Sequence, residues 1–210
     1  MKLSSPFKMT RQKNAMAAAF IIIGVVGRLL LIDVPNIETV MAVAILAGYF
    51  LGGVYMIFVP LTIMVFSDFL IYGNIYAGAY SLQNIMAMSA FTWSGFVFVA
   101  LIGRMSRRKV LKVVRNVAIV TAISIPATIA YDLWTTLGGW YFIYQPLMGW
   151  TLQDALINLT PFMILHLISS LIFVPIFGTL FTLIHSHGWA LLRPVRLPQE
   201  SDDVSGFTSA

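Results

Sequence analysis

The sequence ETVMAVAILAGYFLGGVYMIFVPLTIMVFSDFLIY runs from Glu38 to Tyr72 and is apolar over almost its whole length. Gly52-Gly53 lies near its middle, and consecutive glycines favour a turn. A membrane-spanning helix needs roughly 20 apolar residues, so each half is short for a span and the whole is long for one. The stretch therefore predicts either two short spans joined at Gly52-Gly53 or one long helix.

The distribution of basic residues distinguishes the two alternatives. Of the 13 Lys and Arg residues, four precede the first apolar run, six lie within 104–115, and Arg193 and Arg196 follow the last run. With two spans within 38–72, these three groups of basic residues all lie on the same side of the membrane. With one long helix, the segment 104–115 lies on the side opposite to the N-terminus. Cytoplasmic loops carry the excess of Lys and Arg. We therefore predict an all-α membrane protein with six transmembrane helices and both termini cytoplasmic.

The composition supports a multi-pass protein of the cell membrane. Of 210 residues, 59% are hydrophobic and only 10% are charged, against about 25% charged residues in ordinary soluble domains. Such a chain needs lipid as its main solvent. The expected organisation is a basic cytoplasmic N-terminus over 1–13, a membrane domain over 14–187 and a disordered cytoplasmic tail over 188–210. Outside 38–72 we expect spans over 14–32, 84–103, 113–134 and 156–184, with a polar, aromatic loop from 135 to 151 and possible kinks at Pro161 and Pro175.

Several classes of function lack their sequence motifs. The chain has no cysteine and three histidines, which predicts neither a disulfide nor a metal site, and no cofactor is expected. Because no Walker A sequence occurs, the chain should not hydrolyse ATP itself. No nucleophile stands beside a base, so we do not expect an enzyme. The basic segment 104–115 indicates topology and contact with anionic lipids rather than nucleic acid.

Three charged residues fall inside the apolar runs. Arg28, Asp68 and Asp132 lie late in the first, third and fifth spans, and a charge near the bilayer centre costs at least ~2.5–3.5 kcal/mol. All three spans run outward in the predicted topology, so these residues should lie near the outer face. Arg28 and Asp68 are expected to act as a structural or gating pair, which is compatible with a nearby cavity.

Aromatic and amide side chains also gather toward the predicted outer face. Four of the five tryptophans belong there: Trp93, Trp134, Trp140 and Trp150. An aromatic belt at the headgroup level is one explanation. A flat, polar organic ligand is the other, because rings stack on its faces while polar groups bond its edges. His166, within the last span, is either a packing partner or a contact of that ligand.

The first span begins with small residues. Ala15 and Ala19 form a small-xxx-small pair, and Gly24 and Gly27 continue it. Small side chains let another helix approach closely in lipid, although internal packing uses the same pattern.

Over roughly residues 14–184 the chain resembles the S-components of energy-coupling factor (ECF) transporters, small membrane proteins that bind vitamins or their precursors for uptake. Shared features are six short spans, an alanine-rich first span and a polar outer face. The resemblance to one uncharacterised branch of that group is carried by Arg28, Pro35-Asn36, Ala44, Gly48, Gly52, Val59-Pro60-Leu61 and Asp68, and more loosely by Trp134, Tyr144, Pro146, Gly149 and Pro161-Phe162.

The resemblance implies partners and a site. Ala15 and Ala19 match the surface that docks on a transmembrane T-component, and two cytoplasmic ATPase subunits would supply energy. The small-molecule substrate would enter from outside, and membrane lipids would surround the protein. By position, the residues expected to face the substrate are Asn84, Trp93, Tyr131, Asp132, Trp134, Asn158 and His166.

Two other functions remain open at this point. One is an integral-membrane enzyme acting on lipid or prenyl substrates, which would need acidic or histidine clusters on the inner face, where the sequence has basic residues. The other is a structural membrane subunit without its own ligand, which would have no pocket in its outer half.

Overall fold

The computed structural model describes residues 11–34, 36–75, 81–107 and 113–187. Every regular element in these ranges is helical, so the described part is all-α as predicted. The basic N-terminus and the C-terminal tail lie almost entirely outside the described residues. The elements are α1 (Arg11–Leu30), α2 (Val40–Leu46), the π-helical η1 (Ala47–Leu51), α3 (Tyr55–Ile75), α4 (Leu82–Met105), α5 (Val113–Gly139), the π-helical η2 (Trp140–Tyr144), α6 (Gln145–Met148) and α7 (Leu152–His187).

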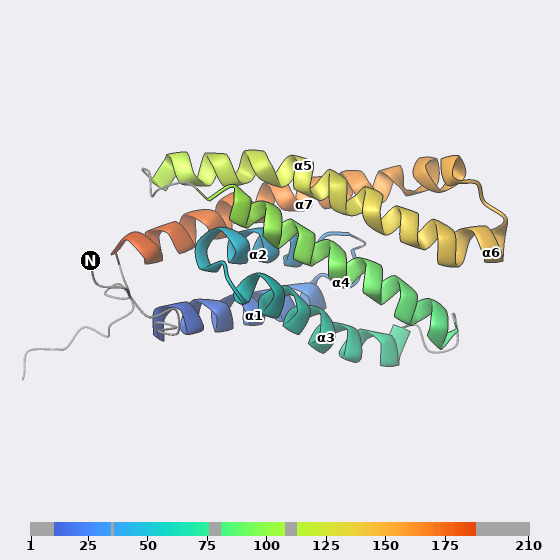
Figure 1. The fold of residues 1–210 in the computed structure, drawn as a ribbon, viewed down its shortest axis with the longest axis horizontal. Helices are drawn as coiled ribbons and strands as arrows, with labels where there is room; N and C mark the ends of the chain where they lie inside the picture. Colours follow the sequence, from blue (N-terminus) through green and yellow to red (C-terminus); the bar gives the residue numbers. More distant parts are fainter. Residues whose placement is uncertain (1–10, 35, 76–80, 108–112, 188–210) are drawn as a thin grey trace, which may run out of the picture.

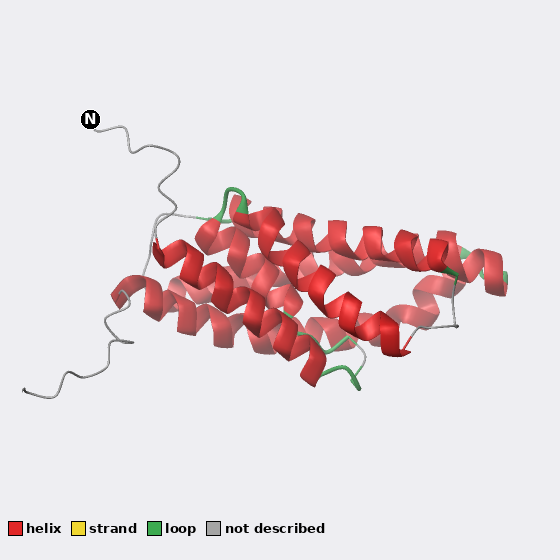
Figure 2. Cartoon of the chain, turned by 90° about the horizontal axis from the view of Figure 1, so that it is seen from below, coloured by secondary structure: helices red, strands yellow, loops and turns green. Residues whose placement is uncertain are grey.

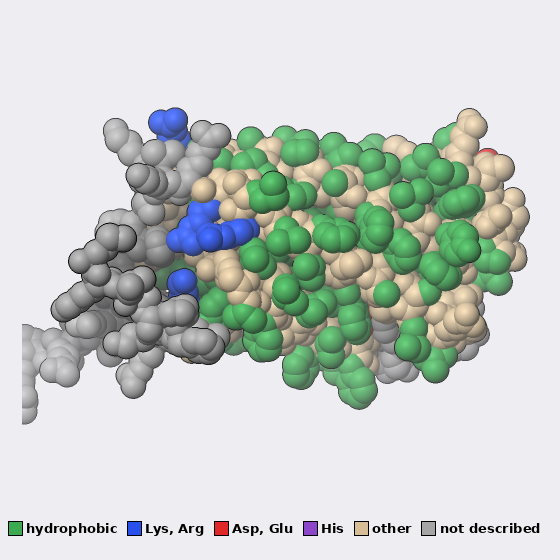
Figure 3. All heavy atoms as spheres, viewed as in Figure 1, with side chains coloured by type: hydrophobic (Ala, Val, Ile, Leu, Met, Phe, Trp, Pro, Cys, Tyr) green, Lys and Arg blue, Asp and Glu red, His purple; other side chains and the backbone are tan. Residues whose placement is uncertain are grey.

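Four helical segments are long and apolar enough to cross a membrane, judged by length and composition: Lys13–Leu30, Leu82–Met105, Arg115–Met148 and Leu152–Ile184. Val40–Leu51 and Tyr55–Ile71 form two shorter apolar helices. Apolar side chains are spread along the whole length of the face drawn in Figure 3, and Phe69 on α3 is 83% exposed. These features are compatible with a multi-pass membrane protein.

The central element is the short helix formed by α2 and η1, every residue of which is buried. It packs on α4 so closely that the backbones touch. A Cβ atom added at Gly48 would lie 1.8 Å from the carbonyl oxygen of Ala100, and one at Gly103 would lie 2.2 Å from that of Ile45. Glycine is therefore required on both sides of this crossing.

The turn expected at Gly52-Gly53 is present. The φ angles of Gly52 and Gly53 are 62° and 59°, in a region where residues with a Cβ atom are strained. Helix α3 begins two residues later, at Tyr55. In Figure 1, α2 and α3 run in opposite directions on either side of this turn.

The loop predicted over residues 135–151 is wrong for most of its length. Helix α5 continues through η2 into α6 and ends at Met148. The chain stops at Gly149, whose φ of 70° gives the left-handed cap typical of helix ends. The ring of Tyr144 then stacks on that of Trp150 at a centroid distance of 5.2 Å.

Helix α7 begins at Leu152, four residues before the expected start at Leu156. Thr151 and Asp154 cap it reciprocally: the Thr151 backbone N–H donates to the Asp154 carboxylate at 2.9 Å, and the Asp154 N–H donates to the Thr151 hydroxyl at 3.2 Å. Both Pro161 and Pro175, expected as kink sites, lie inside this single helix.

The two ends of the bundle differ in charge. Helix α1 begins and α7 ends at the same end (Figure 1). Figure 3 shows Lys and Arg side chains gathered at this end. Helices α3, α4 and α5 extend beyond the connection between α1 and α2 (Figure 1). That connection lies part of the way along the bundle rather than at its end (Figure 2). The connection therefore lies beside the middle of the longer helices.

Candidate functional site

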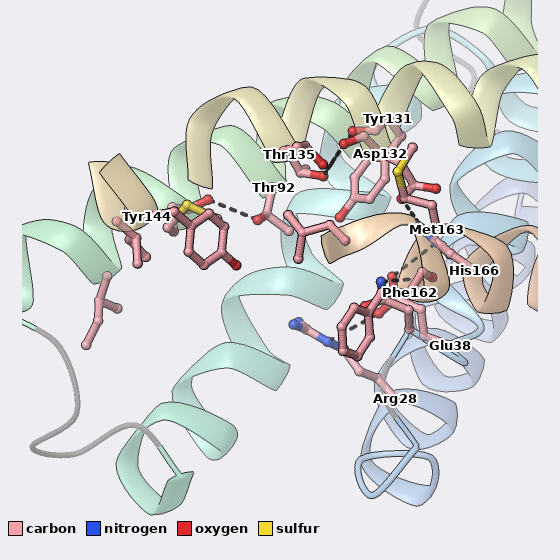
Figure 4. A pocket seen from close by; sticks show the side chains of 16 residues that line it. Arg28, Glu38, Thr92, Tyr131, Asp132, Thr135, Tyr144, Phe162, Met163 and His166 are labelled. Carbon is pink, nitrogen blue, oxygen red and sulfur yellow. Dashed lines mark hydrogen bonds and ion pairs between the residues drawn. The ribbon is translucent and has the colours of Figure 1, made fainter. Parts of the chain in front are cut away.

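A cavity of about 470 Å³ opens beside the α1–α2 connection, between α4, α5 and α7. Its size falls within the roughly 300–1,000 Å³ typical of small-molecule sites. Figure 4 shows its lining, which mixes charged, hydroxyl and aromatic groups. The polar and aromatic side chains that line it are Arg28, Asn36, Glu38, Thr92, Tyr131, Asp132, Thr135, Thr136, Tyr144, Phe162 and His166.

One side of the cavity is formed by an ion pair between α1 and α3. The Arg28 guanidinium donates to the carboxylate of Asp68 at 2.5 Å and to the hydroxyl of Ser67 at 2.6 Å. The other carboxylate oxygen of Asp68 accepts a bond from the Trp93 indole N–H at 2.7 Å. Asp68 is thus fully engaged and does not line the cavity, whereas Arg28 does.

A second buried pair joins α5 to α7. The Nδ1 atom of His166 lies 2.7 Å from Oδ1 of Asp132. A carboxylate accepts only, so Nδ1 carries the proton and donates it. The ring of Tyr131 packs edge-on against the imidazole at a centroid distance of 5.2 Å. This arrangement fixes the ring, and its other nitrogen, Nε2, lies 3.7 Å from the carboxylate of Glu38, which also lines the cavity.

Glu38 lies between the two pairs. Its carboxylate is 3.6 Å from Nε of Arg28 and 3.7 Å from Nε2 of His166, as Figure 4 shows. Its backbone is anchored to α7, because the Glu38 N–H donates to the Ser169 hydroxyl at 3.0 Å and that hydroxyl donates to the Glu38 carbonyl at 2.8 Å. The side chain is 17% exposed, so it remains accessible from the cavity.

Three of the seven residues expected to face a substrate line this cavity: Tyr131, Asp132 and His166. The two tryptophans are engaged elsewhere. Trp93 supports Asp68, and the Trp134 indole donates to the Phe91 carbonyl at 3.1 Å and to the Ser94 hydroxyl at 3.0 Å.

The two asparagines also lie away from the cavity lining. Asn158 donates to the Asp154 carbonyl one turn earlier in α7, at 2.8 Å and in an exposed position. Asn84 lies in the first turn of α4, where its backbone N–H donates to the Ser81 hydroxyl that caps the helix. Neither asparagine lines the cavity.

Sequence reasoning missed Glu38, Thr135, Thr136 and Tyr144 as cavity residues. The two threonines had a signal, because they follow Asp132 by three and four positions and so share its helix face. Tyr144 was assigned to a loop. Glu38 appeared in the sequence only as the first residue of the apolar stretch 38–72, and its position against His166 depends on a tertiary contact with α7.

The small residues of α1 divide between the core and the surface. Ala15 is exposed, whereas Ala19 is half-buried and packs against the core. The exposed face of α1 begins with Ala15 and Ala18. It continues through Ile22 and Val26. A Cβ atom on Gly24 would lie 2.4 Å from the side chain of Ile63, so the glycine serves internal packing.

Comparison with known proteins gives a family. No curated protein and no solved structure matches the chain. One family model does match, over residues 8–191, which include every described helix. The chain therefore belongs to the family described as "Family of unknown function (DUF6580)".

Proposed function

We propose that this protein is the substrate-binding subunit of an ECF-type importer in the cell membrane. It would capture a vitamin or a related small organic molecule from outside and deliver it inward together with a T-component and two ATPase subunits. The observation that carries the proposal is the 470 Å³ cavity, with its mixed polar and aromatic lining, at a distance from the basic end of the bundle. The absence of a Walker A sequence suits a subunit that depends on separate ATPases.

The proposal includes six membrane crossings and cytoplasmic termini. Helices α1, α3, α4, α5 and α7 each account for one crossing, and the α2–η1 helix, at about 18 Å for its length, covers part of the bilayer within the bundle. The start of α1 and the end of α7 lie together at the end where Lys and Arg gather. The positive-inside rule assigns that end to the cytoplasm, and the cavity then opens toward the outer half.

Binding of vitamins to purified protein tests the capture step. We expect one member of a vitamin panel to bind, and Met163→Trp to abolish its binding because the larger ring fills the cavity that Met163 lines. Met86→Trp is the matched control, since Met86 is 63% exposed on α4 and lies outside the cavity lining. Uniform failure of the panel on folded protein would contradict the proposal.

Assembly tests the delivery step. Ala15→Trp should reduce copurification with a T-component, because Ala15 is exposed near the cytoplasmic start of α1. Ile176→Trp, at a 55% exposed position of α7, is the control. Equal copurification of both variants would argue against docking through α1.

A second candidate is a membrane enzyme for lipid or prenyl substrates. The observation that favours it is the Asp132–His166 pair, in which a carboxylate orients an imidazole as in general bases. Incubation with such substrates followed by product analysis separates the two, because an importer subunit returns its ligand unchanged.

A further inference from the structure

The Nε2 atom of His166 is a buried polar atom without a hydrogen-bond partner among the described residues. The side chain is only 2% exposed and lines the cavity. Because Nδ1 donates to Asp132, Nε2 of the neutral imidazole is an acceptor. Leaving such an atom unpaired in a dry site costs about 1–3 kcal/mol. The position thus calls for a donor that the described residues do not supply.

Glu38 presents a second acceptor to the same space. Its carboxylate oxygens lie 3.7 Å from Nε2 of His166 and 3.6 Å from Nε of Arg28, both too long for hydrogen bonds. Among the described residues no donor reaches this carboxylate within hydrogen-bond distance. Two acceptors therefore face one another across a gap that a donor group can bridge.

The local charge is unbalanced in the same sense. Two carboxylates, those of Glu38 and Asp68, share one guanidinium, that of Arg28, while Asp132 pairs with the His166 imidazole. The guanidinium makes its short contact with Asp68, so Glu38 receives only the longer one. A buried negative charge without a close partner is costly, and a ligand that carries positive charge would neutralise it.

We propose that the cavity binds a small organic molecule through a cationic nitrogen whose N–H groups donate to both the Glu38 carboxylate and Nε2 of His166 from the cavity side. The rest of the molecule lies against Tyr144, Phe162 and Met88, which line the same cavity. Aromatic faces attract cations and planar groups. This assignment rests on the binding role proposed above and adds the chemical class of the ligand.

Benzamidine provides a probe of this class, since its planar cation carries several N–H donors. Benzamide has almost the same shape without the charge, and benzoate has the opposite charge. We expect titration of the purified full-length protein, by calorimetry or thermal shift, to give at least tenfold tighter binding of benzamidine than of benzamide, with benzoate weakest.

The Glu38→Gln variant should remove that preference, so that benzamidine binds no more tightly than benzamide. It should fold, because Glu38 anchors α7 through backbone atoms and Arg28 keeps Asp68. Asp33→Asn is the matched control, an exposed carboxylate in the same connection that does not line the cavity, and it should keep the wild-type preference.

Three results would overturn the assignment: benzoate binding as tightly as benzamidine, an unchanged preference in Glu38→Gln, or no benzamidine binding to folded protein at millimolar concentration. Uptake experiments separate this from failure of the proposed function. A vitamin that binds and accumulates but is neutral or anionic overturns the ligand class alone. Selective benzamidine binding without any accumulation of cationic vitamins in cells that contain the ATPases overturns the importer role and supports the class.

Discussion

Replacement of Asp68 by Asn tests the ion pair that joins α1 to α3. The carboxylate of Asp68 is 4% exposed and accepts bonds from Arg28 and from the Trp93 indole. An amide keeps the size of the side chain, but it loses the charge and turns one acceptor into a donor. Either Arg28 or Trp93 then faces a donor, and Arg28 loses its close counter-charge.

The expected cost follows from these contacts. Removing one partner of a buried ion pair typically costs about 3–5 kcal/mol. Arg28 is 18% exposed and keeps Glu38 at 3.6 Å, so the lower end applies and we expect a loss of about 3 kcal/mol. Adding Arg28→Gln removes the uncompensated charge. The loss of unfolding free energy in the double variant should therefore be smaller than the sum of the two single losses by about 1–3 kcal/mol.

Unfolding by sodium dodecyl sulfate from mild detergent micelles, followed by circular dichroism and tryptophan fluorescence, measures these free energies. The Asp33→Asn control should lie within about 0.5 kcal/mol of wild type, because Asp33 is exposed. A loss below about 1 kcal/mol for Asp68→Asn, or additive losses in the double variant, would refute a stabilising role of the pair.

Four further predictions concern glycines and topology. Gly48→Ala should prevent folding or cost more than about 3 kcal/mol, because the new Cβ would lie 1.8 Å from a backbone oxygen of α4; Gly178→Ala, with no neighbour closer than 3.8 Å, should instead stabilise by about 0.5–1 kcal/mol in the same unfolding assay. Gly149→Ala meets no atom but keeps a φ of 70°, so its loss should be only about 1–2 kcal/mol. Because the chain has no cysteine, a membrane-impermeant maleimide should label Asp33→Cys in intact cells and Arg107→Cys only after permeabilisation; the reverse pattern would invert the proposed topology.

Local signals predicted most of the helical pattern. Apolar runs located α1, α4, α5 and α7, and the paired glycines located the turn at Gly52-Gly53. These signals are local because each depends on the preference of a short segment for lipid or for a turn. The end of α5 was misplaced for the converse reason: aromatic residues at 140–144 fit a helix and an interfacial loop equally well, and only the backbone at Gly149 ends the helix.

The part of the site that could be predicted consists of ionisable groups inside apolar runs. A carboxylate and an imidazole inside apolar runs are costly unless they face a partner or a cavity, and Asp132 and His166 do both. Trp93 and Trp134 fit a ligand site equally well by type. Their indole N–H groups are used within the protein instead, and which acceptor a donor finds depends on how the helices pack.

The depth of Glu38 in the bundle follows from the length of the helix that it precedes. The α2–η1 helix rises only about 18 Å, less than the roughly 30 Å of a hydrocarbon core, because the turn at Gly52-Gly53 ends it early. Its start therefore lies part of the way along the longer helices, where the Glu38 backbone bonds to Ser169 on α7. Ser169 follows His166 by three positions, so the same helix face that anchors the chain also presents the imidazole to the Glu38 carboxylate. A full-length second helix would carry this carboxylate to the membrane surface and away from His166, and the acidic cavity thus depends on a helix too short to cross the bilayer alone.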